Sequence, residues 1–256
     1  IDIGGSTIDL SVVALEGGEG QAEPIAQLLR FGGESLEGNT NQVLRTAKVL
    51  GKAGQRLGGR DLDKWIVNHL FPNEALTESL LNRAERLKCR LSEAGIKSNE
   101  NLIEKDKEFH NRNNLSMELN KIEFERLLID NGLLKVLSKL LEKTLATSLT
   151  NGCSLEDLRG VVLVGGGAQI PLVKNWLKNK TEPVPLLTPP PIEAVAKGAL
   201  SLTPGVQVRD ILNHGVSLRC WEQKGQRHIW HPLFLAGQPW PTQRPLEIIL
   251  TASKEN

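Results

Sequence analysis

The chain has 256 residues, of which 39% are hydrophobic and 24% charged, a composition typical of a globular protein with one large core or two modest ones. Its formal net charge is +1, so no strong field attracts nucleic acid or an anionic membrane, and we expect neither as a partner. Three widely spaced cysteines without a CxxC pair indicate neither a disulfide framework nor a zinc site, and they favour a cytoplasmic location.

The first fourteen residues predict two strands joined by a tight turn. Apolar residues alternate with small or polar ones on both sides of the turn 4–6, which is the period of a half-buried strand. A glycine turn lets backbone N–H groups cradle a phosphate, the hydroxyl of Thr7 adds a donor, and Asp2 and Asp9 could hold a hydrated Mg²⁺ beside it. The alternative is a plain hairpin turn with two solvated aspartates.

Two helical patterns follow in the first half of the chain. Residues 58–63 precede a helix that includes Trp65, with acidic residues in its first turn. Residues 77–92 carry an apolar stripe at helical spacing, formed by Leu80, Ala84, Leu87 and Leu91. Side chains on the polar face of the same segment are spaced so that they can meet one ligand together: Glu85, Lys88, Cys89 and Ser92. The alternative is a solvated face with a Glu–Lys ion pair.

The middle of the chain contains a polar segment and then two long helices. Residues 93–114 show no clear hydrophobic period, so we expect this segment to be exposed and mobile. Residues 120–149 have two helical patterns, with Asn120 and Glu123 at the cap and third positions and Gly132 between the helices. We expect these helices to back the sheet.

A second glycine cluster follows an apolar run. Residues 161–164 have the length and β-branching of a buried strand, and three glycines, 165–167, end it. Pro171 then suits the first turn of a helix. The pattern predicts a strand, a glycine loop and a helix, and its alternative is the tight β-to-α connection that is common in any α/β protein.

The last fifty residues predict a small β unit. Residues 216–221, 228–234 and 246–252 read as short strands separated by glycine and proline turns. Three tryptophans gather in this segment: Trp221, Trp230 and Trp240. They could form a surface that contacts peptides, but aromatic residues in a β unit are more often core, and we favour the core.

The order and spacing of six stretches resemble the seventy-kilodalton heat-shock protein (heat shock protein 70) chaperones. The stretches are IDIGGSTIDLSVV, LGGRDLDKWIVNHL, LLNRAERLKCRLS, MELNKIEFERLL, LRGVVLVGGGAQIPLVKNWL and PPIEAVAKGAL. The resemblance implies an α/β fold, the second lobe of an actin-like (ribonuclease H-like) ATPase domain over residues 1–203, with a helical subdomain over 58–119. It further implies a linker over 204–209 and an incomplete substrate-binding β-domain over 210–256. Because the match begins at the family's second phosphate loop, we expect a fragment without the first lobe and with very weak hydrolysis.

The resemblance also implies a nucleotide site. Three residues match the family's positions beside the Mg²⁺ and the attacking water or in its phosphate turn, and are expected to support catalysis: Asp2, Thr7 and Asp9, with the two aspartates holding Mg²⁺ through water. The expected nucleotide contacts are Gly4, Gly5, Ser6, Gly58, Gly59, Glu85, Lys88, Cys89, Ser92, Gly165, Gly166 and Gln169.

The chain departs from the family pattern at several of these positions. Cys89 and Gln169 stand where the family usually has two arginines that sandwich the adenine ring, so that stacking contribution is absent. Arg60 replaces an acidic residue, Ile192 an aspartate near the adenosine, and Ser6 a glycine of the phosphate turn. The resemblance is therefore to a divergent member.

The function implied is an ATP-dependent chaperone of the stress response that uses ATP or ADP with Mg²⁺ and binds unfolded or extended polypeptides. J-domain proteins and nucleotide-exchange factors are the co-chaperones that such a protein has. The alternative is a catalytically silent chaperone-like scaffold, so whether the chain supports ATP hydrolysis stays open at this point. A bacterial actin-like cytoskeletal ATPase is a weaker alternative, because the β segment argues against it.

Overall fold

The computed structural model describes residues 1–21, 43–104, 116–191, 193–202, 206–242 and 245–249. The chain divides into two compact units, the first formed by 1–12 and 52–203 and the second by 13–51 and 204–256. Helices and strands mix in the chain, so the predicted α/β class is confirmed. The domain boundaries expected from the sequence stay predictions.

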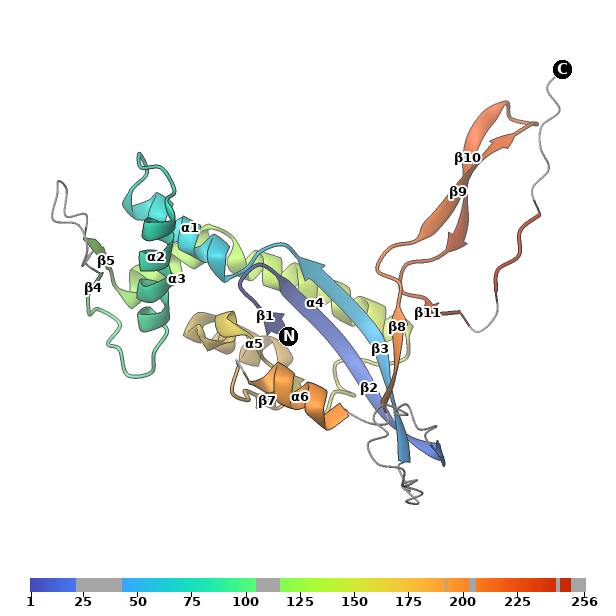
Figure 1. The fold of residues 1–256 in the computed structure, drawn as a ribbon, viewed down its shortest axis with the longest axis horizontal. Coiled ribbons are helices and arrows are strands. Elements are labelled where there is room, and N and C mark those ends of the chain that lie inside the picture. Colours follow the sequence, from blue (N-terminus) through green and yellow to red (C-terminus); the bar gives the residue numbers. More distant parts are fainter. Residues whose placement is uncertain (22–42, 105–115, 192, 203–205, 243–244, 250–256) are drawn as a thin grey trace, which may run out of the picture. The chain divides into compact units, whose positions relative to one another are not determined.

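The strands of the first unit form short ladders between its helices (Figure 1). They are β1 (Asp2–Ile3), the start of β2 (Ile8–Gln21), the end of β3 (Val43–Gln55), β4 (Leu102–Glu104), β5 (Met117–Leu119), β6 (Val161–Val162) and β7 (Leu186–Leu187). β1 and β2 pair antiparallel around the turn 4–6, which confirms the predicted hairpin. β4 and β5 are also antiparallel, whereas β6 and β7 are parallel.

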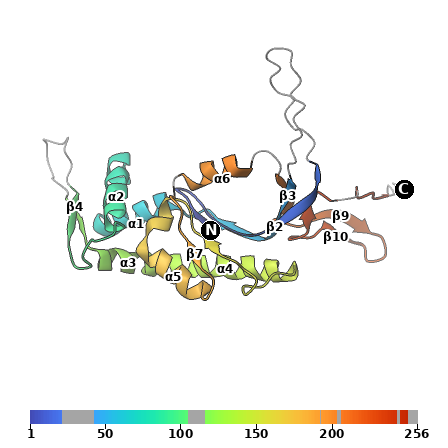
Figure 2. The same cartoon turned by 90° about the horizontal axis from the view of Figure 1, so that it is seen from below.

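Five helices of the first unit match the predicted patterns: α1 (Gly59–Leu70), α2 (Glu78–Leu91), α3 (Lys121–Asp130), α4 (Leu133–Thr150) and α5 (Pro171–Thr181). The helix α6 (Ala194–Leu202) was not predicted, and a short 3₁₀ helix, η1 (Gly166–Gln169), forms within the predicted glycine loop. Figure 2 shows α4 and α6 on opposite sides of β1 and β2. None of the described helices is both long enough and apolar enough to cross a bilayer.

Local chemistry explains where these helices begin. Thr77 accepts a hydrogen bond from the Leu80 N–H and so caps α2. Asn120 and Glu123 form a reciprocal capping box at the start of α3, as predicted. Gly132 separates α3 from α4 with a φ of +80°, a backbone conformation that favours glycine.

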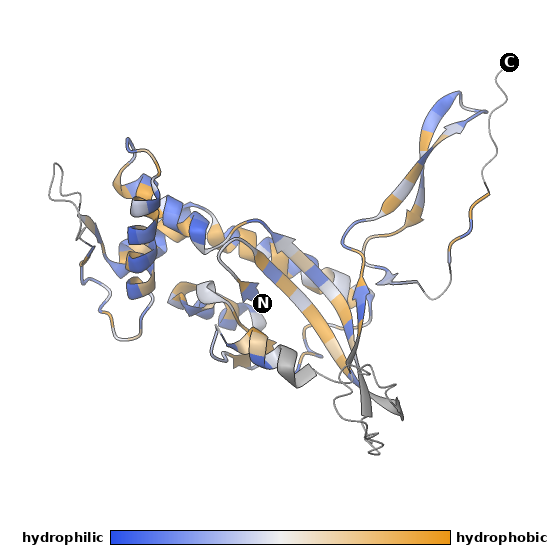
Figure 3. Cartoon of the chain, viewed as in Figure 1, coloured by the Kyte–Doolittle hydropathy of each residue, from blue (hydrophilic) through white to orange (hydrophobic). Residues whose placement is uncertain are grey.

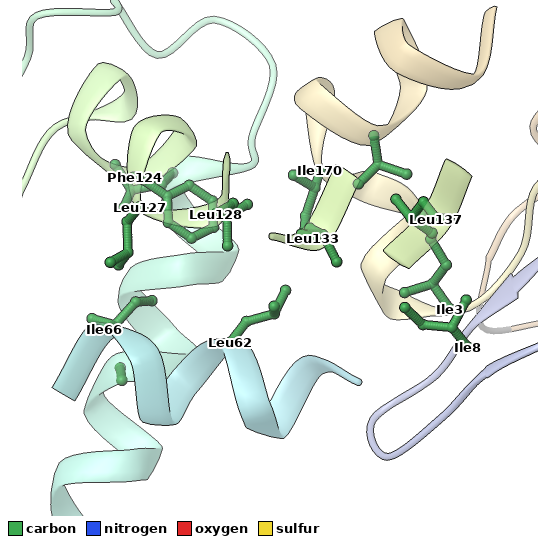
Figure 4. Packing of buried hydrophobic residues seen from close by; sticks show 14 of the residues in the cluster. Ile3, Ile8, Leu62, Ile66, Phe124, Leu127, Leu128, Leu133, Leu137 and Ile170 are labelled. Carbon is green, nitrogen blue, oxygen red and sulfur yellow. The ribbon is translucent and has the colours of Figure 1, made fainter. Parts of the chain in front are cut away.

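One continuous apolar cluster holds the first unit together. Figure 4 shows Leu62 of α1 facing Leu128 of α3, while Leu137 of α4 lies beside Ile3 and Ile8 of the hairpin. These five side chains are buried. The expectation that α3 and α4 support the strands is therefore confirmed for α4, which packs directly on β1 and β2, and α3 is joined to it through the same cluster.

The second unit is built from strands in its described part. Besides the remaining parts of β2 and β3 it contains β8 (Val206–Ile211), β9 (Val216–Glu222), β10 (Arg227–Phe234) and β11 (Pro239–Trp240). β8 pairs parallel with β3 and antiparallel with β11, and β9 and β10 form an antiparallel hairpin. Residues 206–209, assigned to a linker by the resemblance, are thus the start of a strand.

Two sequence expectations for this unit are wrong. Residues 246–249 form no strand, because no described strand hydrogen-bonds to them, and residues 250–252 lie outside the described part. The three tryptophans are not core: Trp221, Trp230 and Trp240 are 49%, 68% and 42% exposed. No residue of β9 or β10 is buried. Two of the rings make an edge contact with one other ring each, Trp221 with His228 and Trp240 with Phe234, but these contacts do not form a core.

The polar segment 93–114 is described only in part. Most of residues 93–101 are exposed, as expected, whereas Leu102 is buried at the start of β4. Residues 105–114 lie outside the described part, and mobility of the segment stays a prediction. Ile192, one of the departures from the family pattern, also lies outside it.

Candidate functional site

The first unit contains a pocket of about 500 Å³, a size typical of small-molecule sites. Its walls come from the glycine turn 4–6, the start of α1, one face of α2, and η1 with the residues around it. The lining residues are Gly4, Gly5, Ser6, Gly59, Arg60, Leu62, Asp63, Leu81, Asn82, Glu85, Lys88, Cys89, Ser92, Gly166, Gly167, Gln169 and Ile170. Segments far apart in the sequence therefore meet at one cavity.

Most of the residues that the sequence proposed for nucleotide contact line this pocket together. They are Gly4, Gly5, Ser6, Gly59, Glu85, Lys88, Cys89, Ser92, Gly166 and Gln169. Five other candidates lie outside the lining: Asp2, Thr7, Asp9, Gly58 and Gly165. Most of the ligand-binding candidates are thus brought together, whereas the three residues expected to support catalysis are not among those that line the pocket.

Backbone hydrogen bonds attach the glycine turn to the N-terminus of α1. The Gly59 N–H donates to the Gly4 carbonyl and the Arg60 N–H to the Gly5 carbonyl, each at 2.9 Å. A Cβ at Gly58 would lie 2.5 Å from the Ser6 nitrogen, so only glycine allows this approach. Within the described part, the N–H groups of Gly5 and Ser6 donate to no protein acceptor. Two turn donors are therefore available to an anion in the pocket.

Lys88 is the most constrained charged side chain of the pocket. Its Nζ donates to the Gly59 carbonyl at 2.8 Å and lies 2.7 Å from Oδ1 of Asp63. Only 12% of the Lys88 side chain and 6% of the Asp63 side chain are exposed. Desolvation raises the pKa of the Asp63 carboxyl, and Lys88 opposes that change. Lys88 thus pairs with Asp63 of α1 instead of with Glu85, the partner that the solvated-face alternative required.

Sequence reasoning missed Asp63. The helical spacing within residues 77–92 identifies neighbours on α2, but Asp63 lies on α1, and no local pattern connects the two helices. The signal that was present, an aspartate soon after a glycine pair, indicated only a helix start. Asp63 enters the pocket because α1 and α2 pack together.

Cys89 and Gln169, the two residues that stand where the family usually has arginines, both line the pocket. Cys89 is exposed, on α2, and desolvation raises the pKa of its thiol, which therefore stays protonated at neutral pH. Gln169 is the last residue of η1. Arg60, another departure from the family pattern, forms an exposed ion pair with Glu78 at the start of α2.

Asp2 and Asp9 lie directly opposite each other on β1 and β2. Opposite residues of an antiparallel pair share one face of the sheet, and like charges there repel each other. A cation would relieve that repulsion, and Mg²⁺ commonly takes one or two carboxylates while keeping several waters. The described residues contain no cluster of three or more metal-ligating side chains. The pair therefore fits a hydrated Mg²⁺ and not a cage made of protein ligands alone.

Gly165 stands against this aspartate pair. Its φ is +86°, and a Cβ there would lie 2.5 Å from Oδ1 of Asp2. The predicted strand before it is shorter than expected, because β6 ends at Val162 and Val164 makes an isolated parallel bridge to Asp2. The second glycine cluster is thus held next to the first by backbone contacts.

Comparison with known proteins shows the family of the chain. The family described as Hsp70 protein matches residues 1–217. The chain is 31% identical to the chaperone protein DnaK of Deinococcus proteolyticus over 211 residues, which are 77% of this chain and 28% of that protein. It is 27% identical to the chaperone protein HscA homolog of Shewanella denitrificans over 206 residues, 77% of this chain and 27% of that protein.

A third relative has a similar sequence identity and a similar share of aligned residues. The chain is 31% identical to the chaperone protein DnaK of Prochlorococcus marinus over 229 residues, 82% of this chain and 30% of that protein. The aligned part is thus less than a third of the length of each of these relatives.

Proposed function

Because the chain belongs to the Hsp70 family, we propose that its pocket binds ATP and ADP together with Mg²⁺. The observation that carries this proposal is the meeting of the glycine turn, the start of α1 and the polar face of α2 around one cavity of about 500 Å³. Family membership supports the chaperone interpretation over the bacterial cytoskeletal alternative.

The polar groups of the pocket suit the parts of a nucleotide. The free N–H groups of Gly5 and Ser6 can donate to a phosphate, as glycine turns do at anion sites. On α2, the Glu85 carboxylate can accept hydrogen bonds from ribose hydroxyls, and the Lys88 ammonium can donate to the nucleoside. The hydroxyl of Ser92, the C-cap of α2, donates to the Lys88 carbonyl at 2.8 Å, so toward a ligand it acts as an acceptor.

We further propose chaperone activity of the kind named for the relatives. Unfolded or extended polypeptides would be its clients, with a J-domain protein and a nucleotide-exchange factor as co-chaperones. The support is family membership together with the sequence identity to DnaK and HscA proteins. A cytoplasmic location and a role in the stress response stay predictions.

A second candidate is nucleotide binding without turnover, in a chaperone-like scaffold. It is favoured by one observation: Asp2, Thr7 and Asp9 lie outside the pocket lining, whereas ten candidates for ligand contact lie in it. Single-turnover hydrolysis by the chain and its Asp9→Ala variant separates the two candidates. Phosphate release that the variant lacks supports the ATPase, and equal release from both proteins supports the scaffold.

The position of Cys89 provides a direct test of binding. Cys89 lines the pocket, whereas Cys153 and Cys220 do not, and all three are free thiols. We expect millimolar Mg²⁺–ADP to slow alkylation of Cys89 by iodoacetamide, measured by peptide mass spectrometry, because the ligand covers the thiol. Alkylation of Cys153 and Cys220 should keep its rate. Equal alkylation of Cys89 with and without nucleotide would contradict the proposal.

A further inference from the structure

Asp63 has a place in the pocket that the proposed nucleotide site does not explain. It lies on α1, behind the polar face of α2, and its side chain is 6% exposed. A carboxylate so little exposed requires a partner, because burying an unpaired charge is costly. Its ion partner is Lys88, at 2.7 Å, and Lys88 also lines the pocket.

The ammonium group of Lys88 is held from two sides. Gly59 accepts a hydrogen bond from Nζ at 2.8 Å, and a Cβ at Gly59 would lie 3.2 Å from the same atom, so glycine keeps this approach open. Oδ1 of Asp63 lies 2.7 Å from the same Nζ, as an ion-pair contact. A lysine ammonium has three N–H donors, so with both of these groups engaged at least one donor stays available for a group in the pocket.

We propose that Asp63 is a positioning residue, which fixes the Lys88 ammonium so that its remaining donor meets a ligand in the pocket. This inference rests on the proposed nucleotide site and adds a residue to it. Lysine has a long flexible side chain and loses much rotamer freedom when it is ordered. Asp63 and Gly59 impose that order before the ligand arrives, so a ligand meets a fixed donor.

The inference predicts a specific pattern in a double-mutant cycle for Mg²⁺–ADP affinity, measured by calorimetry on the chain. Asp63→Asn and Lys88→Met should each weaken binding about tenfold, the loss of one charge-assisted hydrogen bond. The double variant should bind as weakly as Lys88→Met alone, because Asp63 acts through Lys88. It also carries neither buried charge, which protects it from the unfolding that one orphaned charge can cause.

Asp61 provides the matched control. It lies on the same helix, it also forms an ion pair with a lysine, Lys64, at 2.9 Å, and it lies outside the pocket lining. Asp61→Asn should leave the affinity for Mg²⁺–ADP within about twofold of the original, because a pair outside the pocket contributes no ligand contact. An unchanged affinity in Asp63→Asn, or a further loss when it is added to Lys88→Met, would overturn the inference.

A measurement without nucleotide separates this inference from the proposed function. Loss of the Asp63 carboxylate removes the ion pair that holds the Lys88 ammonium, whose side chain is only 12% exposed, so an amine-reactive ester should reach and acylate this amine faster. Mass spectrometry of the unliganded chain gives that rate, with Lys64 as the internal reference. Faster acylation of Lys88 in Asp63→Asn supports the positioning role even if the original chain binds no nucleotide, a result that would contradict the proposed function alone. An unchanged acylation rate would contradict the positioning role.

The pH profile gives a third readout. The charged groups that act on Asp63 are Lys88 and Glu85 of α2 and Arg60 of α1. Desolvation raises the pKa of Asp63, so acidification protonates it earlier than an ordinary aspartate and releases Lys88. We therefore compare the dissociation constants of the Asp63→Asn variant and the original chain for Mg²⁺–ADP. Their ratio should fall toward one as the pH falls, because protonated Asp63 no longer holds Lys88. A ratio that is constant with pH would contradict the role.

Discussion

The two units use similar strand patterns but differ in burial. In the first unit a continuous apolar cluster runs from the β1–β2 hairpin through α1, α2, α3 and α4 to α5. In the second unit the buried apolar residues of the described part are Ala47 and Ile211. Figure 3 shows apolar residues along β9 and β10 as well, yet these strands have no buried residue.

The difference shows that alternation alone does not make a core. In the first unit, helices supply a second layer, so an apolar face of β1 and β2 is removed from water and stabilises the fold. The hairpin of the second unit consists of two strands, and a two-stranded hairpin by itself is marginally stable in water. Substitutions that are matched between the units should therefore have very different effects.

The largest expected effect is in the core of the first unit. Phe124 on α3 is 1% exposed and packs within the apolar cluster. Phe124→Ala removes that contact and leaves a cavity, so we expect the free energy of unfolding to fall by about 3–5 kcal/mol, measured by urea denaturation. A loss below about 1 kcal/mol would mean that the cluster is less tightly packed than the structure indicates.

A pair of glycines compares the backbone packing of the two units. A Cβ at Gly165 would lie 2.5 Å from Oδ1 of Asp2, at a φ of +86°, so we expect Gly165→Ala to cost about 1–3 kcal/mol. In the β9–β10 turn, a Cβ at Gly225 would meet the flexible end of Glu222, which can move away. Gly225→Ala should change the free energy of unfolding by less than about 0.5 kcal/mol. Equal costs in the two variants would contradict the comparison.

Ion pairs should show a smaller difference, which depends on pH. Desolvation tends to raise the pKa of the Asp61 carboxyl. Hydrogen bonds from Lys64 and the Gly58 N–H outweigh it and lower that pKa below 3.8. As the pH falls through that window the unfolded chain binds the proton first, so the stability that Asp61 contributes is present above pH 3.8 and is lost on acidification. Asp61→Asn should cost about 1 kcal/mol at neutral pH and flatten this dependence in acid denaturation curves.

The corresponding pair in the second unit provides the control. Arg227 and Glu222 lie 3.5 Å apart, and the Arg227 side chain is 72% exposed. An exposed pair of this kind contributes little, so Glu222→Gln should cost less than about 0.5 kcal/mol at any pH. A cost as large as that of Asp61→Asn would show that the hairpin is more ordered than its exposure indicates.

The smallest effect is expected at the tryptophans of the hairpin. Trp230 is 68% exposed, so Trp230→Ala should change the free energy of unfolding by less than about 0.5 kcal/mol. The fluorescence of Trp230 is the difference between the original chain and this variant. Iodide should quench it, because the ring is accessible to water. Trp230 fluorescence that iodide leaves unquenched would show a covering layer on the hairpin and would remove the contrast between the units.

The elements with strong local signals were predictable from the sequence. The apolar stripe of residues 77–92 is buried in α2, the capping box at Asn120 begins α3, and Pro171 is the first residue of α5. Two pocket walls were found in the same way, since the glycine turn and the polar face of α2 are each encoded within a few residues. These features depend on backbone geometry and on neighbours along the chain.

Features that need a distant partner were not predictable. The tryptophans of the hairpin look like core residues by type, but burial depends on a second layer that their own sequence does not specify. A strand was expected over residues 246–252, and the described part of that range, 246–249, forms none, because a strand also needs a neighbour to accept its hydrogen bonds. The sequence likewise gave no reason to connect Asp63 with Lys88.

The sequence by itself determined the helices, the glycine turns and the family pattern, because these follow from local spacing and from residues that act through the backbone. Tertiary structure alone decided that the turn 4–6 is attached to the start of α1, that Lys88 pairs with Asp63, and that the tryptophans of the hairpin are exposed. The physical reason is the same in all three cases. Desolvation and pairing depend on which surfaces meet in space, and that is set by the packing of whole elements.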